Sequence, residues 1–458
     1  MLRIFITTIL FFYPILISAQ EKTETLRLLE EKIGDTSIEF EEVDRAPKTL
    51  KNYNERLRAK YNNRMLELGL SLSKIPDNDG FALDWDTSFG EAIQVLAKHA
   101  IYSDKARYRL YQLIEDDCFY YVINGLSKYP DVLEQIKPEL IKLLFEILDI
   151  PGKTSPVSRA EKYVYISKQK LDNENYSSIL IRNLTYKMNN YEAYNLVYAF
   201  NGFDRLNENA RLFLEILLSV DIGKKISALE TTYDAHRKHF RSLFSLADVM
   251  EDRNRTNLIT VANNSMPNGE AAGDISPLYA AAILLKHDKN HQAAKSILEE
   301  YLSAELNLLS VDRDFDYADF QGSSKNYPGF LYVNQDFDAV YVNISPLEGL
   351  FYGYGPNNDE FKQILLEELT SVSKARSINA ARLIINKNIE PSEDMMKVLL
   401  NKAATNYGGR GFNYYVLTLK NAKPTKEVTD VLKEIVKEQD QYRRKYSQEV
   451  LDFFDTIK

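Results

Sequence analysis

Apolar residues return every three or four positions along most of this chain, which is the spacing of helices with one apolar face. One such run spans residues 47–72, and the span 91–264 shows the same spacing without the alternation typical of strands. Two segments, 140–148 and 212–218, carry apolar faces wide enough to predict helices that are covered on more than one side. The pattern therefore predicts a chain built almost entirely of helices.

Single residues mark several helix starts. Ser103 is placed to cap a helix that begins at Asp104. Pro130 and Pro138 each stand where the first turn of a helix tolerates proline. The last helix is expected to begin at Thr425 and to run past residue 450 as one long charged helix that closes the array.

Residues 277–304 have the pattern of a helical hairpin with its turn at 287–290. Ala294, Leu298 and Leu302 follow one another at four-residue steps in its second helix, and the hairpin resembles one unit of the tetratricopeptide repeat family. Beyond residue 357 the expected helices are short, joined by short turns, and similar to a HEAT-type array without a strict period. The resemblance implies an all-α fold, an irregular helical-repeat array that is α-solenoid or α/α toroid-like. It implies no function.

Turn-forming residues suggest how the chain is divided. The run 265–276 contains proline and several glycines and is the best candidate for a hinge. The expected organisation is a signal peptide at 1–19, an N-terminal helical region at 20–264, the hinge, and a C-terminal helical region at 277–458 that carries a small irregular or β insertion near 311–355.

The first residues predict where the protein is found. Arg3 precedes an apolar run from Ile4 to Ile17, which is too short to cross a bilayer, and Ala19 precedes a polar start at Gln20. This pattern is typical of a secretory signal peptide rather than a membrane anchor. The mature protein is therefore expected to be secreted or periplasmic, with no transmembrane segment. A bacterial lipoprotein requires cysteine where Gln20 stands, so no lipoprotein anchor is expected.

Charge and cysteine content narrow the classes of partner and of chemistry. The 458 residues carry a formal net charge of −9. Because nucleic acids attract basic surfaces, this charge argues against a nucleic-acid partner. Cys118 is the one cysteine, so the fold forms no internal disulfide and depends on its packed core. The expected role of Cys118 is that of a small buried side chain; a nucleophilic role would require a histidine close to it in space.

The insertion at 311–355 is where we expect a ligand site, because binding residues often lie in irregular segments on a rigid scaffold. It opens with four aspartates, Asp312, Asp314, Asp316 and Asp319. As an EF-hand loop this run fails, since Tyr317 stands where glycine is needed and Ser323 where glutamate is needed. Alternate carboxylates on an extended chain can still bind one calcium ion; the alternative is a hydrated acidic loop. No other cofactor is expected.

Aromatic residues follow these aspartates. Residues 330–333 and 340–344 have the composition of two strands, which predicts a hairpin around 334–338. Tyr332 and Tyr341 are the candidate contacts for a sugar ring, because aromatic rings beside carboxylates suit the apolar faces and the hydroxyl groups of sugars. The alternative is that these rings pack the insertion onto the helices.

Other catalytic patterns are weak or absent. The pairs His236/His239 and His287/His291 have the spacing of zinc ligands on one helix face, but arginine and aspartate stand where the zinc-protease motif requires glutamate. The second pair is also expected to straddle a turn. The motifs of serine hydrolases, phosphate-binding loops and dinucleotide-binding loops are absent. Glycan-cleaving enzymes bring their acids together in space rather than in sequence, so an enzyme stays open.

The leading hypothesis is an exported, non-enzymatic helical-repeat protein that binds a glycan, a peptide or a protein partner. The alternative is a polysaccharide lyase or a glycoside hydrolase on a helical toroid.

If the insertion holds the ligand, Asp314→Ala and Tyr332→Ala should each weaken binding by roughly 1 kcal/mol or more, because each removes a proposed contact. Calorimetry with any ligand that the protein retains would measure the change. Unchanged affinity in both variants would mean that the site lies elsewhere.

Overall fold

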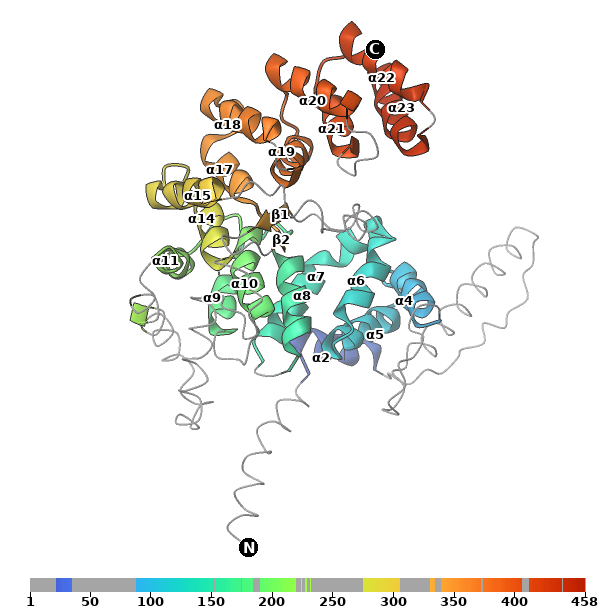
Figure 1. Ribbon diagram of the computed structural model, residues 1–458. Coiled ribbons are helices and arrows are strands. Elements are labelled where there is room, and N and C mark those ends of the chain that lie inside the picture. The colour runs from blue at the N-terminus through green and yellow to red at the C-terminus, as the bar shows by residue number, and fades with distance from the viewer. Residues whose placement is uncertain are drawn as a thin grey trace, which may run out of the picture. The chain divides into compact units, whose positions relative to one another are not determined.

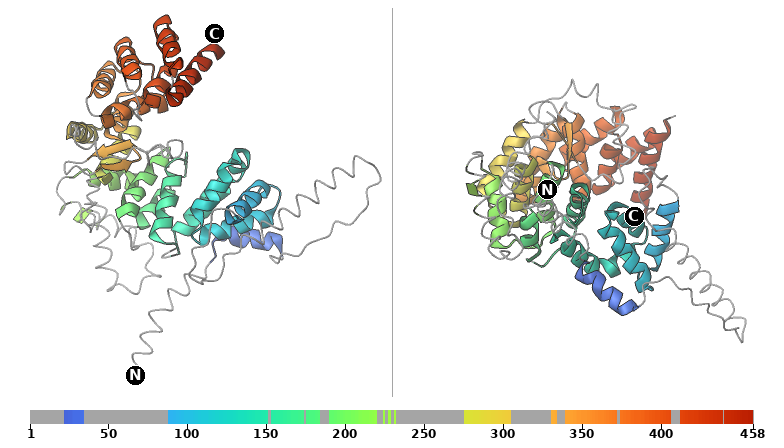
Figure 2. Two further views of the ribbon diagram at one scale, coloured as in Figure 1. Left: turned by 45° about the vertical axis from the view of Figure 1, so that its right-hand side comes forward. Right: turned by 90° about the horizontal axis from the view of Figure 1, so that it is seen from below.

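Figure 1 shows the computed structural model, in which the chain divides into two compact units. The first unit is Met1–Asn207 with Thr232–Leu258, and the second unit is Glu208–Thr231 with Ile259–Lys458. The structure describes residues 22–34, 88–150, 153–173, 175–183, 190–219, 275–304, 330–333, 339–371, 374–405, 412–438 and 440–457, with a few isolated positions between 224 and 231. Figure 2 gives two further views of the same helices.

Helices that alternate between two rows build the first unit (Figure 1). They are α2 (Glu24–Ile33), α4 (Ser88–His99), α5 (Asp104–Glu115), α6 (Phe119–Ser127), α7 (Pro130–Leu148), α8 (Pro156–Ile166), α9 (Asn175–Arg182), α10 (Asn190–Ala199) and the 3-10 helix η2 (Phe200–Gly202). In one row α4, α6, α8 and α10 pack against one another in succession, and in the other α2, α5, α7 and α9 do the same. From α4 to α7, each helix is therefore covered both by a neighbour in sequence and by a helix two places away.

Two capping residues and a first-turn proline begin three of these helices. Ser103 accepts a hydrogen bond from the backbone N–H of Ala106 and caps α5, which begins at Asp104 as predicted. Thr23 caps α2 in the same way. Pro130 lies in the first turn of α7, also as predicted. These caps satisfy backbone N–H groups that have no partner inside the helix.

Pro138 does not begin a helix, so that prediction was wrong. It lies inside α7, which continues through it from Pro130 to Leu148. A proline in a helix interior costs roughly 3 kcal/mol because it removes one backbone hydrogen bond and crowds the preceding turn. Ile136, Leu140 and Leu143 are all buried around it. At about 1.5–3 kcal/mol for each buried side chain, this packing outweighs the proline.

A close backbone contact fixes the spacing between α8 and α10. At Gly202 an added Cβ atom would lie 2.1 Å from the carbonyl oxygen of Ile166, so only glycine fits there. Next to it, the N–H of Leu171 donates to the carbonyl of Gly202 and the N–H of Asp204 donates to the carbonyl of Leu171, both at 2.8 Å. The resulting isolated parallel bridge between Leu171 and Phe203 is strand-like pairing within 91–264, where none was predicted.

A buried ion pair also joins α8 to α10. Arg159 donates through Nε at 2.5 Å and through Nη2 at 3.2 Å to the two carboxylate oxygens of Glu192. Its Nη1 donates to the carbonyl of Thr154 at 2.6 Å. Arg159 is 4% exposed and Glu192 is 0% exposed. Such a pair adds little stability over apolar residues of the same shape, but it penalises any arrangement that separates the two charges.

The second unit repeats the two-row arrangement. Its elements are α11 (Glu208–Leu217), α14 (Ile275–His287), α15 (Gln292–Ala304), β1 (Phe330–Val333), β2 (Ala339–Val342), α17 (Pro346–Tyr354), α18 (Asp359–Thr370), α19 (Lys374–Asn386), α20 (Glu393–Thr405), α21 (Phe412–Thr418), the 3-10 helix η5 (Leu419–Asn421), α22 (Lys426–Val436) and α23 (Gln441–Thr456). In one row α11, α14, α17, α19, α21 and α23 pack in succession, and α18, α20 and α22 form the other.

The helical hairpin predicted at 277–304 is confirmed. α14 and α15 pack against each other across the turn at His287–His291. Ala294 and Leu298 are 0% exposed. α11, which was assigned to the N-terminal region, packs against α14 and belongs to the second unit. Most of the predicted hinge at 265–276, like the signal peptide and the helix at 47–72, lies outside the described residues.

The insertion contains the predicted hairpin but ends earlier than expected. β1 pairs with β2 in antiparallel fashion, with Phe330 opposite Val342 and Val333 opposite Ala339. The prediction of an irregular segment up to residue 355 was wrong for its last part, because Pro346–Tyr354 forms α17. A cap at Ser345 begins this helix. The helix has only nine residues, too few to show a helical period clearly.

The predicted single closing helix is two helices. α22 ends at Val436, and α23 begins at Gln441 after Asp440, whose side chain accepts hydrogen bonds from the backbone N–H groups of Tyr442 and Arg443. The two helices pack against each other. Apolar residues continue at helical spacing across the break, so periodicity alone joined the two segments, while the capping signal at Asp440 separates them.

Apart from the strand pair and the isolated bridge, the described residues form helices, so the all-α class is confirmed. Among these described helices, none combines the length and the apolar character that a membrane span requires.

Removing one partner of the buried ion pair should destabilise the first unit strongly. We expect Arg159→Met to lower the free energy of unfolding by about 3–5 kcal/mol, because the carboxylate of Glu192 is left buried without its cation. Denaturant unfolding would measure this loss. Arg27→Met is the control, since Arg27 pairs with Glu24 on the surface with both side chains 50% exposed, and it should change stability far less. Equal effects in the two variants would contradict the interpretation.

Candidate functional site

Only some of the residues predicted to hold a ligand are among those that the structure describes. Asp312, Asp314, Asp316 and Asp319, the candidate calcium and ligand residues, lie outside the described residues. Tyr332 belongs to β1 and Tyr341 to β2, and they pair with Val340 and Leu331 respectively. Successive positions of a strand belong to opposite faces, so the register places positions 332 and 341 on different faces of the hairpin. The role of Tyr332 and Tyr341 as contacts for a sugar ring stays a prediction.

The hairpin is attached to the helices of the second unit. β1 packs against α19. Just after β2, the backbone N–H of Asn343 donates a hydrogen bond of 2.8 Å to the hydroxyl of Tyr279 on α14. These contacts attach the strand pair to α14 and α19.

Glu348, another acid of the predicted insertion, has a structural role. It lies in the first turn of α17 and is 7% exposed. Its carboxylate is 2.6 Å from Nζ of Lys387 at the end of α19 and accepts a hydrogen bond of 3.1 Å from the hydroxyl of Tyr352. Nζ of Lys387 in turn donates to the Tyr352 hydroxyl at 3.2 Å. This closed network satisfies all three groups and ties α17 to α19, leaving no group directed to a ligand.

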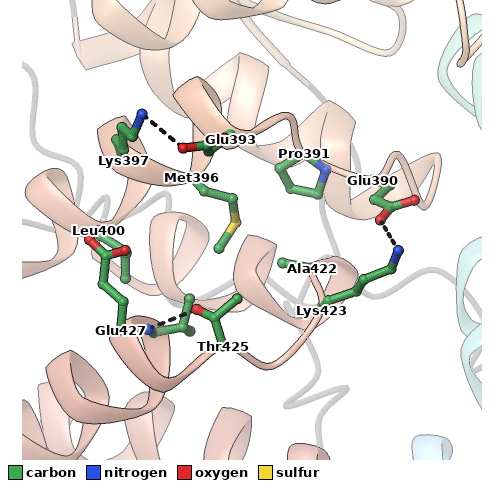
Figure 3. A pocket seen from close by; sticks show the side chains of 11 residues that line it. Glu390, Pro391, Glu393, Met396, Lys397, Leu400, Ala422, Lys423, Thr425 and Glu427 are labelled. Carbon is green, nitrogen blue, oxygen red and sulfur yellow. Dashed lines mark hydrogen bonds and ion pairs between the residues drawn. The ribbon is translucent and has the colours of Figure 1, made fainter.

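A groove between α20 and α22, here called the α20/α22 groove, is a better candidate (Figure 3). Its volume is about 220 Å³. The lining residues are Glu390, Pro391, Glu393, Met396, Lys397, Leu400, Ala422, Lys423, Thr425, Glu427 and Val428. They come from the N-terminal half of α20, from the first turn of α22 and from the chain just before each helix.

Two caps bring the groove residues into place. Ser392 accepts a hydrogen bond from the N–H of Met395 and begins α20. Thr425 accepts one from the N–H of Val428 and begins α22. Because α20 packs against α22, the starts of both helices lie side by side. The sequence predicts the start at Thr425, but it could not show that this start lies beside that of α20.

The floor of the groove is apolar and firmly packed. Val428 is 1% exposed, Leu400 7% and Ala422 8%. Met396 points into the space above them and is half-buried (Figure 3). A methionine thioether is flexible and adapts to the shape of a contacting group. An apolar cavity of about 150 Å³ holds a molecule the size of benzene, so this groove has room for one large apolar side chain.

Charged side chains surround the floor. Nζ of Lys397 lies 3.1 Å from Oε1 of Glu393, and Nζ of Lys423 lies 3.8 Å from Oε1 of Glu390. All four side chains are more than half exposed. Exposed ion pairs of this kind contribute about 0–1 kcal/mol, so a ligand can displace them at little cost. Glu427 has no cationic partner among the described residues.

Cys118 is buried in the first unit, as predicted. It is 6% exposed and lies just before α6. Burial raises the pKa of its thiol to about 11, and Asp116 and Asp117 add to the rise. The thiol is therefore protonated at neutral pH, which does not suit a nucleophile.

Lys162 on α8 is a charged side chain buried inside the first unit. It is 0% exposed, and its Nζ donates to Oγ of Ser158 at 2.5 Å and lies 5.3 Å from the ring centre of Phe119. Burial lowers the pKa of Lys162 to about 8, although Asp117 and Glu161 oppose the shift. Because the side chain of Lys162 is inaccessible, we interpret it as a structural residue. Its burial disfavours the charged form of the ammonium group.

The histidine pairs do not form a metal centre in the described residues. His287 lies in the last turn of α14, and Nδ1 of His291 accepts a hydrogen bond of 3.2 Å from the N–H of Ala294 at the start of α15. The pair therefore straddles a turn, as predicted. His236 and His239 lie outside the described residues. Within the described ranges, no three acidic, histidine or cysteine side chains converge on a metal position.

Comparisons with known proteins give no further guide. No protein-family model matches the chain, and no curated protein and no solved structure matches it significantly. Function is therefore inferred from the geometry of this chain alone.

Replacing Lys162 should change how stability depends on pH. The pKa of Lys162 is about 8 in the folded chain against an ordinary value of 10.5, so between these values the unfolded chain binds the additional proton and stability rises with pH. Lys162→Met removes this penalty and should stabilise the first unit at pH 7 by up to about 3 kcal/mol. The advantage over the natural chain should shrink between pH 8 and pH 10.5.

Urea unfolding at a series of pH values would measure that difference. Lys98→Met, at an exposed position of α4, serves as the control and should show no such trend. An advantage for Lys162→Met that does not change with pH would contradict the assignment.

Proposed function

We propose that this chain is an exported, non-enzymatic binding protein of the helical-repeat type, and that its partner is a polypeptide. The observation that carries this proposal is the α20/α22 groove, in which an apolar floor is surrounded by exposed, weakly held ion pairs. Interfaces between proteins combine a buried apolar centre with a polar rim in the same way. A volume of about 220 Å³ is smaller than the roughly 300–1,000 Å³ of most small-molecule sites.

The packing of the helices supports the repeat-type array. In each unit the helices alternate between two rows, so that each hairpin stacks on the one before it. We propose an irregular helical-repeat array, α-solenoid or α/α toroid-like, for this arrangement. Stacked hairpins present the ends and outer faces of their helices as extended binding surfaces, which suits a polypeptide.

Export is proposed from the N-terminal pattern of a basic residue, a short apolar run and a small residue before Gln20.

Two parallel assays on the mature chain, residues 20–458, test the proposal. The first measures retention of a mixed library of short peptides on the immobilised protein. The second incubates the protein with a panel of polysaccharides and follows new reducing ends and unsaturated products. We expect retained peptides and no turnover. Turnover that a single carboxylate or tyrosine substitution abolishes would replace the binding function with the enzyme alternative. Retention of polysaccharide alone would make the partner a glycan.

A further inference from the structure

From the chemistry of the α20/α22 groove we infer the kind of peptide that it binds: a segment with one large apolar side chain next to a lysine or an arginine. This inference rests on the proposed polypeptide-binding function and adds the character of the partner. It follows from two properties of the lining, an apolar floor with room for one side chain and an unbalanced set of charges.

The apolar half of the inference comes from the floor. The floor consists of Leu400, Ala422 and Val428, and Pro391 and Met396 add apolar surface beside it. No aromatic ring lies among the lining residues. Thr425 carries the one hydroxyl of the lining, and this hydroxyl already accepts the N–H of Val428. A sugar ring would find no aromatic stacking partner there, whereas an aliphatic or aromatic side chain can fill the space above the apolar floor.

The cationic half comes from the balance of charges. Three glutamates line the groove, Glu390, Glu393 and Glu427, against two lysines, Lys397 and Lys423. Each lysine already lies beside a glutamate, and Lys397 lies 3.4 Å from a further carboxylate, that of Asp394. The lining therefore carries surplus negative charge near Glu427, which attracts a cation and repels an acidic peptide.

The helix starts oppose this preference only in part. Each start carries about half a positive charge from the helix dipole, which favours anions. The acids of the first turns, Glu393 and Asp394 on α20 and Glu427 on α22, offset this charge. On α22 the full charge of the Glu427 carboxylate exceeds the half charge of the helix start, so a net negative charge remains and the preference for a cation stands.

The chain contains a matched pair of reporters for the test. Met396 lines the groove, while its neighbour Met395 is 0% exposed on the core side of the same helix. With methyl-labelled methionine in the mature chain, a peptide that enters the groove shifts the Met396 signal and leaves the Met395 signal in place.

The probes are three acetylated and amidated peptides, Gly-Ser-Leu-Lys-Ser-Gly, Gly-Ser-Leu-Glu-Ser-Gly and Gly-Ser-Ser-Lys-Ser-Gly. We expect the first to shift the Met396 methyl signal with the highest affinity. The loss of leucine should abolish the shift, and the exchange of lysine for glutamate should weaken binding about two- to fivefold, as expected for one exposed ion pair.

Substitution on α22 then locates the charge preference. Glu427→Gln should bring the affinities for the lysine and glutamate peptides close together, and Glu427→Lys should reverse their order. Asp430→Asn is the matched control, since Asp430 is also exposed on α22 but does not line the groove. Both positions are exposed, so the variants should fold normally.

Three results would overturn the inference: no shift of Met396 with any peptide, equal affinity for the serine and leucine peptides, or an unchanged charge preference in Glu427→Gln. If library peptides are still retained by the immobilised protein in those cases, polypeptide binding stands and only the groove assignment fails. If no peptide is retained at all, the proposed function fails with it.

Discussion

The apolar faces of these helices are too wide for a single neighbouring helix to cover. The need to bury the remaining apolar surface determines how both units are built. α14 is buried at every position from Ile275 to Leu285, and α7 buries side chains from Val132 to Leu148 on several sides. Removing apolar surface from water contributes about 25 cal/mol per Å². A lone hairpin would leave much of that surface exposed, whereas stacked hairpins cover it from the adjacent helix and from the helix two places away.

Buried charges fix which helices meet, although they add little stability themselves. Arg159 and Glu192 join α8 to α10, and Glu348 with Lys387 joins α17 to α19. Each pair satisfies its charges only when its two helices are in place, and an unpaired buried charge is costly. Lys162 shows the opposite case, since it is buried beside a hydroxyl and an aromatic ring and its pKa falls.

The α20/α22 groove follows from the same construction. Where two helices of one row begin side by side, their first turns carry solvent-facing charges while the residues behind them are packed into the unit. Met396 lies between the exposed charges and the packed residues, half-buried above Leu400 and Val428. The packed floor lends rigidity, and the exposed ion pairs at the rim can exchange partners, so the groove combines a fixed shape with adaptable charge.

Local patterns were enough to predict the helical class, the hairpin at 277–304, the strand pair and the cap at Ser103, because spacing and capping depend on residues within a few positions. The same local rules failed at Pro138, at the end of the insertion and at Asp440, where long-range packing or a competing cap prevails. The groove could not be predicted from the sequence, because the residues near Pro391 and those near Thr425 become neighbours only when α20 packs on α22. Residues distant in the chain meet through the burial of apolar faces, which depends on the whole unit rather than on any one segment.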